Sequence, residues 1–206
     1  MNKLLVSLVL SLGMAGSAYA QEILVGDAEA GAGKVAICAA CHGPDGNSLS
    51  ADFPKIAGLG EKYLYKQLND IKAGDRVVIE MTGMLNNLDE QDLRDIAAFY
   101  DGQTHAPGVA NDAELVARGE QIYRGGDLAT GLPACTGCHS PTGKGNDPAG
   151  YPLLSGQHAK YIATQLTSFR EGERANDGES MVMRTIASRL SNKDIEAVSA
   201  YIQGLR

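Results

Sequence analysis

The chain has 206 residues, of which 44% are hydrophobic and 21% are charged, a composition typical of a globular protein rather than a disordered one. Its formal net charge of −7 at pH 7 argues against a nucleic-acid partner. Aromatic residues make up only 5% of the chain, and tryptophan is absent. Because so few large side chains are available for burial, we expect something other than aromatic residues to help fill the core.

Residues 1–20 have the pattern of a secretory signal peptide. Lys3 provides a positive start, residues 4–12 are almost entirely apolar, and "AYA" at 18–20 is a small-residue cleavage site. The apolar run is too short to span a membrane. We therefore expect export to the periplasm and a mature chain that begins at Gln21. In that oxidising compartment, unprotected cysteine pairs would become disulfides.

All four cysteines lie in two pentads of one pattern, "CAACH" at 38–42 and "CTGCH" at 135–139. C-x-x-C-H is the attachment signature of c-type haem. Thiols three positions apart on a helical turn face the same way and can bond the two vinyl groups of one porphyrin. The sequence therefore predicts two covalently bound haem c groups. Their thioether residues would be Cys38 and Cys41 for the first and Cys135 and Cys138 for the second.

Three other uses of the pentads fit less well. A thioredoxin-like redox pair would need a βαβ context, which the sequence lacks. Four-cysteine zinc sites usually separate their C-x-x-C pairs by roughly 15–20 residues, a much shorter spacing than the one here. Disulfides within each pentad remain open as an alternative, but they leave the repeated His42 and His139 unexplained.

After the first pentad the sequence predicts two helices. Residues 53–74, "FPKIAGLGEKYLYKQLNDIKAG", start with a Pro-containing loop, carry apolar side chains at helical spacing and end on Gly74, which suits a helix C′ position. Residues 88–100 follow the pattern of a capped helix, with Asp89 as N-cap and with Leu88 and Leu93 spaced as a hydrophobic staple. Because period-2 alternation is hard to find anywhere, we expect an all-α protein.

The stretch "DGQTHAPGVAND" at 101–112 is rich in Gly, Pro, Asn and Asp and is typical of a linker. It divides the mature chain into an N-terminal domain, 21–105, and a C-terminal domain, 106–206. Each domain is small enough that its apolar core alone would be marginally stable. A large bound apolar cofactor would explain how each domain stays folded.

The C-terminal half repeats the N-terminal half. Residues 151–172 align without gaps on 53–74, and residues 190–202 align on 88–100, with Ser191 as the second N-cap. The repeat indicates that both halves share one fold and bind the same cofactor.

The histidine of each pentad, His42 or His139, is the predicted proximal ligand of the haem iron. The repeat also selects the sixth ligands. When Leu88 is aligned on Leu190, Met81 falls on Met183, whereas Met84 falls on Ile186 and Met181 on Ile79. We therefore predict that Met81 and Met183 are the second axial ligands, and that Met84 and Met181 pack in the haem pockets.

Together these motifs resemble those of the dihaem cytochromes c4, which consist of two class I cytochrome c domains in tandem, each wrapped around one haem. The resemblance spans essentially the whole mature chain. It includes both pentads, the loops "FPK" and "YPL", and the segments "EMTGML" (80–85), "ESMVMR" (179–184) and "SNKDIEAVSAYIQGL" (191–205). It implies that the backbone carbonyls of Pro54 and Pro152 accept the remaining N–H of the ligating histidines.

The same resemblance implies a periplasmic electron carrier that is often held loosely at the inner membrane. Such carriers pass electrons from a quinol-oxidising cytochrome complex to a haem–copper terminal oxidase. In this family the two haems face each other across the domain interface, with their propionates near the contact. Four helix-face residues are expected to line the haem crevices, with packing as their default role: Tyr63, Gln67, Tyr161 and Gln165.

His/Met ligation raises the reduction potential of a haem and leaves no open position on its iron. The sequence therefore predicts one-electron transfer, not catalysis, and no small-molecule substrate. Two alternatives remain open: a dihaem peroxidase, in which one haem would lose its sixth ligand, and a cytochrome subunit of a periplasmic dehydrogenase.

The two domains differ in charge. Residues 21–105 contain 7 basic and 14 acidic residues, whereas residues 106–206 contain 10 basic and 11 acidic residues. Because charge affects how redox partners meet, we hypothesise that donor and acceptor prefer different domains.

Overall fold

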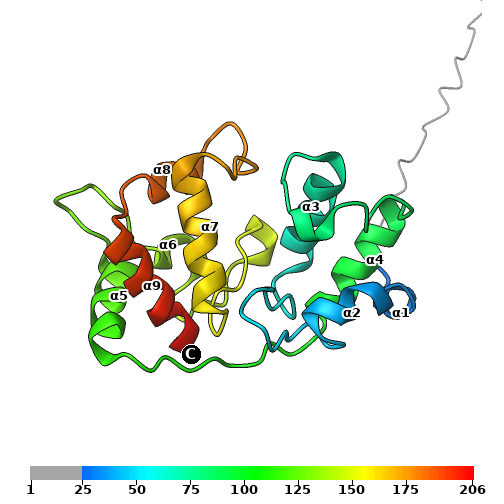
Figure 1. The fold of residues 1–206 in the computed structure, drawn as a ribbon, viewed down its shortest axis with the longest axis horizontal. Helices are drawn as coiled ribbons and strands as arrows, with labels where there is room; N and C mark the ends of the chain where they lie inside the picture. The colour runs from blue at the N-terminus through cyan, green and yellow to red at the C-terminus, as the bar shows by residue number, and fades with distance from the viewer. Residues whose placement is uncertain (1–24) are drawn as a thin grey trace, which may run out of the picture.

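The computed structural model describes residues 25–206, so the predicted signal peptide lies outside the described residues. The described part of the chain consists of helices and loops, with two isolated β-bridges and no strand. The predicted all-α class is confirmed. The chain forms two lobes that lie side by side (Figure 1). Within residues 25–206, none of the helices is both long enough and apolar enough to cross a bilayer.

The four main helices of the two lobes follow one another in the same order, and the lobes differ in the short turns between them. The N-terminal lobe consists of α1 (Ala28–Ala32), α2 (Ala36–His42), α3 (Glu61–Ala73), the 3-10 turn η1 (Ile79–Met81) and α4 (Glu90–Asp101). The C-terminal lobe consists of α5 (Ala113–Gly125), α6 (Thr136–His139), the 3-10 turn η2 (Asp147–Ala149), α7 (Ala159–Glu171), α8 (Val182–Ala187) and α9 (Asn192–Gly204).

The last helix of each lobe organises its core. In the N-terminal lobe α4 packs against α1 and α3, and in the C-terminal lobe α9 packs against α5 and α7. Leu64, Ile96 and Tyr100 are buried in the first core. Ile122 and Val198 are buried in the second. Each core therefore forms where apolar faces of helices far apart in sequence meet.

A glycine allows the first and last helices of each lobe to cross closely. A Cβ on Gly31 in α1 would lie 2.1 Å from the backbone oxygen of Asp95 in α4. A Cβ on Gly119 in α5 would lie 2.1 Å from the backbone oxygen of Ala197 in α9. Real side chains do not fit at such distances, so both crossings require glycine.

Local capping sets the ends of the repeated helices. Asp89 and Ser191 each form a capping box at the start of α4 and α9, as the sequence predicts. Gly74 and Gly172 end α3 and α7 in the left-handed conformation, with φ of 87° and 79°. These predicted helix ends are therefore confirmed.

The segment that joins the lobes contains no helix between residues 104 and 112. It runs along the base of both lobes from α4 to α5 (Figure 1). The predicted boundary between residues 105 and 106 falls inside it, and the limits of the two domains stay predictions.

Candidate haem sites

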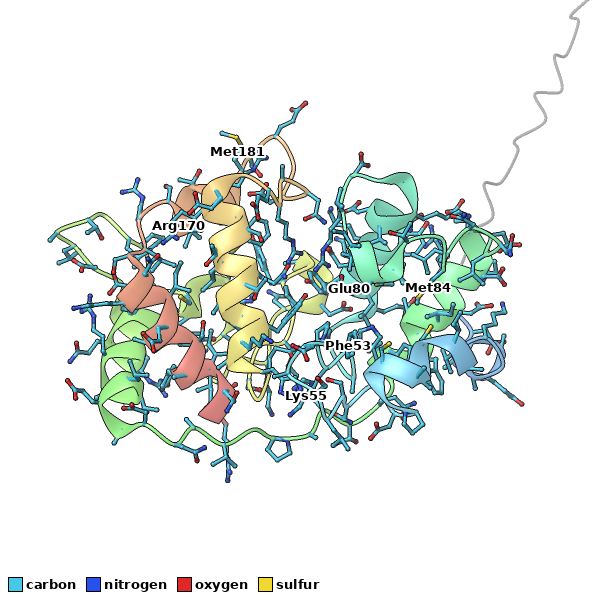
Figure 2. The ribbon with its side chains drawn as sticks, viewed as in Figure 1. Phe53, Lys55, Glu80, Met84, Arg170 and Met181 are labelled. Atoms are coloured by element: carbon cyan, nitrogen blue, oxygen red, sulfur yellow. The ribbon has the colours of Figure 1, made fainter. Side chains whose placement is uncertain are left out.

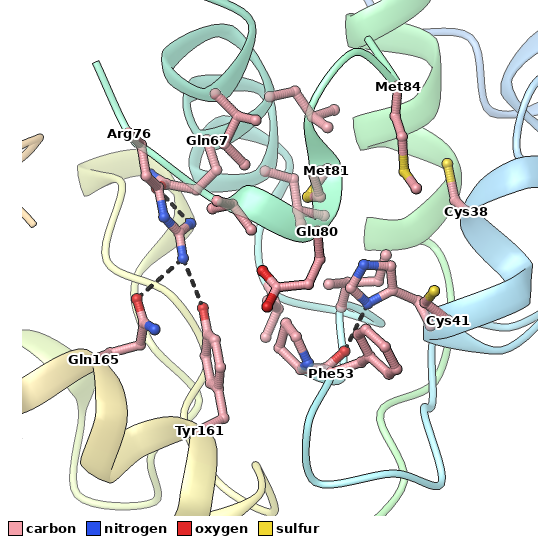
Figure 3. Close-up of a pocket in the computed structure, with 18 of the residues that line it drawn as sticks. Cys38, Cys41, Phe53, Gln67, Arg76, Glu80, Met81, Met84, Tyr161 and Gln165 are labelled. Atoms are coloured by element: carbon pink, nitrogen blue, oxygen red, sulfur yellow. Dashed lines mark hydrogen bonds between the residues drawn. The ribbon is translucent and has the colours of Figure 1, made fainter. Parts of the chain in front are cut away.

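A cavity of about 700 Å³ opens beside the first pentad, in the N-terminal lobe, and extends to α7 of the C-terminal lobe. Cys38, Cys41 and His42 from α2 line it, together with Met81 from η1 and Met84 from the loop that follows (Figure 3). Its size is within the range of cofactor sites, and most of its surface is apolar. The cavity therefore collects the predicted thioether residues, the predicted proximal histidine and a predicted axial methionine of one site.

Both cysteines of the first pentad line the cavity. All four cysteines are free of disulfides. Burial raises the pKa of the Cys38 thiol, and it raises the pKa of the Cys135 thiol to about 11. These thiols therefore stay protonated at neutral pH, and the disulfide alternative for the pentads is not what the structure contains.

Both pentad histidines are held by a proline carbonyl. The Nδ1 of His42 lies 2.9 Å from the backbone oxygen of Pro54, and the Nδ1 of His139 lies 3.0 Å from that of Pro152. Because a carbonyl only accepts, each Nδ1 carries the proton and donates it. Each Nε2 then has its lone pair free, as a metal ligand requires.

The electrostatics of these rings favour ligation. Burial lowers the pKa of His42 and of His139, against the opposing effect of the proline carbonyls. A neutral imidazole is the form that binds a metal. Phe53 and Tyr151, which occupy the same place in the repeat, each approach the ring edge-on, with centroids 6.4 Å and 6.0 Å away. Both rings are thus neutral and fixed in orientation.

The two methionines that the repeat selects as iron ligands are less exposed than the other two. Met81 and Met183 are half-buried, whereas Met84 is 37% and Met181 is 46% exposed. Met181 points outward at the surface (Figure 2), so the packing role expected for it is not seen. The choice of Met81 and Met183 as iron ligands stays a prediction.

A buried lysine and a buried glutamine hold the two lobes together. The backbone N–H of Lys55 donates to Gln157 Oε1 at 2.9 Å, and Gln157 Nε2 donates to the Lys55 carbonyl at 2.7 Å. The Lys55 ammonium donates to the carbonyls of Ala106 and Gly156, at 2.8 and 2.9 Å. Lys55, a residue of the N-terminal lobe, thus contacts both the connecting segment and the C-terminal lobe.

Arg76 reaches from the N-terminal lobe into the C-terminal lobe. Its Nη1 donates to Gln67 of its own lobe at 2.9 Å. Its Nη2 donates to the Tyr161 hydroxyl at 3.0 Å and to Gln165 Oε1 at 3.1 Å, both on α7 (Figure 3). One guanidinium group therefore connects α3 and α7 across the interface.

Arg174 makes the reciprocal set of contacts. Its Nη1 donates to Gln165 of its own lobe at 2.6 Å. Its Nη2 donates to Gln67 Oε1 at 3.0 Å and to the Tyr63 hydroxyl at 3.3 Å, both on α3. Tyr63, Gln67, Tyr161 and Gln165 all line the cavity, as expected, but they act as hydrogen-bond acceptors and not only as packing residues.

This pair of arginines was not among the predicted site residues, although the sequence carries a signal for it. The ungapped alignment of the two halves ends at Gly74 and Gly172. Two residues further on, Arg76 aligns with Arg174. Extending the alignment would have found the pair, but not that each arginine contacts the opposite lobe.

The two halves together fit covalent haem attachment. Paired thiols, an imidazole with a free Nε2, a thioether and an apolar cavity meet at the first site. The second site has the same thiols and imidazole, with Cys135 as the N-cap of α6, Cys138 and His139 within it, and His139 only 8% exposed.

Known proteins resemble this chain along its whole length. The family model described as "Cytochrome c" matches residues 28–101 and 116–206. A cytochrome c4 of Azotobacter vinelandii is 60% identical, with both chains fully covered. The crystal structure of reduced recombinant cytochrome c4 from Pseudomonas stutzeri has a TM-score of 0.87 at 60% identity, covering 88% of this chain and 100% of that one. A thiosulfate dehydrogenase electron acceptor of Thiomonas intermedia is 33% identical over 82% of this chain and 78% of its own.

Proposed function

This chain belongs to the cytochrome c4 family, and on that premise we propose that it carries single electrons in a periplasmic respiratory chain, from a quinol-oxidising cytochrome complex to a haem–copper terminal oxidase. Cytochrome c domains bind haem c covalently, and two domains in tandem account for two haems. The chain is accordingly an electron-transfer protein. The route and the location are our proposal, and the pattern of a signal peptide in residues 1–20 supports the location.

One observation carries the proposal: each lobe presents a neutral imidazole whose Nδ1 is bound to a proline carbonyl. Haem c supplies reversible one-electron chemistry at iron, and thioether ligation raises its potential. Pro54 and Pro152 keep Nε2 of each ring directed for ligation. The half-buried Met81 and Met183 would close the second axial position and exclude peroxide or oxygen from it.

Reduced protein mixed with membranes that contain a haem–copper oxidase tests the route. We expect rapid reoxidation, followed by absorbance, together with oxygen uptake. Membranes in which the oxidase is inhibited by cyanide serve as the control. If the protein stays reduced in the presence of active oxidase, the proposed acceptor is wrong.

The charge difference between the halves supports separate docking faces for donor and acceptor. Glu80 and Glu179 are exposed. Glu80 lies directly before Met81, and Glu179 lies four residues before Met183. We expect Glu80→Lys to slow transfer with one partner and Glu179→Lys to slow transfer with the other. If both substitutions slow both reactions equally, the partners do not prefer different lobes.

A second acceptor role is favoured by the relative that is named a thiosulfate dehydrogenase electron acceptor. In that role the protein would take electrons directly from a periplasmic dehydrogenase. Reduction of the oxidised protein by purified thiosulfate dehydrogenase and thiosulfate tests it. No reduction of the protein under conditions in which that dehydrogenase reduces its own acceptor would exclude this role.

A further inference from the structure

One buried hydroxyl of the N-terminal lobe has no hydrogen-bond partner. Tyr100, on α4, is 1% exposed, and its hydroxyl makes no hydrogen bond within residues 25–206. The residue is closely packed, because a Cβ on Gly46 would lie 2.8 Å from the Tyr100 Cδ1, and the Tyr100 carbonyl accepts the N–H of Gly58 at 2.8 Å. A buried polar group without a partner costs free energy, so this hydroxyl calls for an acceptor.

The hydroxyl lies beside the first cysteine of the first pentad. Tyr100 and Cys38 both line the cavity of that pentad. Burial raises the pKa of both groups; the Tyr100 hydroxyl opposes this effect at Cys38, whereas the Cys38 thiol adds to it at Tyr100. The two groups are therefore close enough to act on each other, and the sulfur of Cys38 is a candidate acceptor for the unpaired hydroxyl.

The C-terminal lobe exchanges the two side chains at this place. When the lobes are aligned at the glycines of their helix crossings, Val35 falls on Tyr123 and Tyr100 falls on Ile202. All four side chains are buried. One tyrosine and one aliphatic side chain thus meet in each core, but the tyrosine comes from the last helix in one lobe and from the first helix in the other. The exchange changes mainly where the hydroxyl lies.

The hydroxyl of Tyr123 already has an acceptor. It donates to the backbone carbonyl of Ser140 at 2.8 Å, and since a hydroxyl has only one proton, none is left for a sulfur. In the second pentad Tyr151, at the position of Phe53, lies beside Cys138, whose thiol raises the pKa of the tyrosine. Tyr151 is only half-buried, so water competes for its hydroxyl. The buried, unpaired hydroxyl is therefore a feature of the first site.

A hydrogen bond to an attached cysteine acts on the haem at short range. A sulfur keeps lone pairs after it forms a thioether, so it is still a weak acceptor. The positive end of a hydroxyl dipole beside the ring stabilises the form that has more electron density, which is the ferrous one. Because water is largely excluded from the site, this effect is weakly screened. Such a donor raises the reduction potential.

We propose that Tyr100 is a positioning residue of the first haem site, whose hydroxyl donates to the Cys38 sulfur once that cysteine carries haem and thereby raises the reduction potential of the N-terminal haem alone. The inference deepens the proposed function, on which it rests for the presence of two haems. It makes two sites of one design unequal, and it does not depend on the identity of the redox partners.

A redox titration of the holoprotein followed by NMR tests the proposal, because it reports the reduced fraction of each haem separately. The N-terminal haem is identified by the methyl signals that lie close to the ring at position 100. We expect Tyr100→Phe to lower the equilibrium constant for reduction of this haem about two- to fivefold, the effect of one hydrogen bond to a neutral acceptor. The C-terminal haem should be unchanged.

Two further variants serve as controls. Tyr65→Phe removes a hydroxyl that binds Glu90 outside this cavity, and it should change neither haem. Tyr151→Phe gives the second site the side chain found in the first, and it should leave the N-terminal haem unchanged. A fall for the N-terminal haem in Tyr151→Phe as large as that in Tyr100→Phe would show that the effect is not local and would overturn the proposal.

Thermal unfolding of both redox states gives a second readout. A hydrogen bond that favours ferrous haem makes Tyr100→Phe cost more stability in the reduced protein than in the oxidised one, whereas a purely structural hydroxyl would cost the same in both. If both equilibrium constants stay as in the wild type, or if both fall equally, Tyr100 does not act through Cys38 and the proposal is wrong. Failure of electron delivery to an oxidase would leave these constants measurable, so the two proposals fail separately.

Discussion

Lys55 and Gln157 exchange two hydrogen bonds across the interface between the lobes, one from the Lys55 backbone N–H and one to its carbonyl. A side-chain amide thus satisfies both backbone groups of a residue far away in sequence. This contact and the paired arginines hold the two haem sites in one fixed relation.

Replacing Gln157 by Leu should destabilise the docking of the lobes. Gln157 is 2% exposed, and the substitution would leave the N–H and C=O of Lys55 buried without partners. We expect a loss of about 2–4 kcal/mol in the free energy of unfolding, measured by urea denaturation. Gln121→Leu, on the exposed face of α5, is the control and should be nearly neutral. Equal effects of the two substitutions would contradict this role of Gln157.

The axial assignments can be separated by substitution of each methionine. Met81→Leu and Met183→Leu should each remove thioether ligation at one of the two haems. We expect that haem to become high-spin and to bind cyanide, and we expect roughly half of the His/Met absorbance band to be lost. Met84→Leu and Met181→Leu are matched controls on the same loops and should leave the band intact. Loss of the band in a control variant, with Met81 and Met183 present, would reverse the assignment.

Asp95 should make stability depend on pH in the acid range. It is 2% exposed, and although burial opposes its charge, hydrogen bonds from Lys34, the Asp27 N–H and Gln91 hold its pKa below the usual range. A carboxyl whose pKa is lower in the folded state than in the unfolded state stabilises the protein at pH values above its unfolded-state pKa, about 3.9. This stabilisation disappears as the pH falls through the folded-state pKa.

We therefore expect Asp95→Asn to cost about 2 kcal/mol at pH 7 and less at about pH 3, measured by urea denaturation at both pH values. Glu196→Gln, at an exposed position of α9, is the control, with little effect at either pH. A cost for Asp95→Asn that is the same at both pH values would show that the carboxylate charge does not matter.

Two glycines of α5 should respond in opposite directions to alanine. Gly119→Ala places a methyl group against the Ala197 carbonyl, where the helices would have to separate, and should cost about 1–3 kcal/mol in unfolding free energy. Gly125→Ala meets nothing within 4 Å and should stabilise by about 0.4–1 kcal/mol. Thermal unfolding of both variants is the measurement, and a stable Gly119→Ala protein would show that the α5–α9 crossing tolerates a side chain.

Features that depend on local spacing were determined by the sequence alone. The helix caps at Asp89 and Ser191 and the helix ends at Gly74 and Gly172 follow from interactions between residues within a few positions of each other. The pentads and the repeat likewise indicated two haem sites of one design, because attachment needs only two thiols and an imidazole on one helical turn.

Only the tertiary structure decided what happens between the lobes. The alignment of the halves places Arg76 opposite Arg174, yet nothing in it shows that each arginine bonds a tyrosine and a glutamine of the other lobe. The buried exchange between Lys55 and Gln157 has no counterpart in the repeat. These contacts depend on how two folded lobes are oriented, which is set by surface complementarity over many residues and leaves no periodic pattern in the chain.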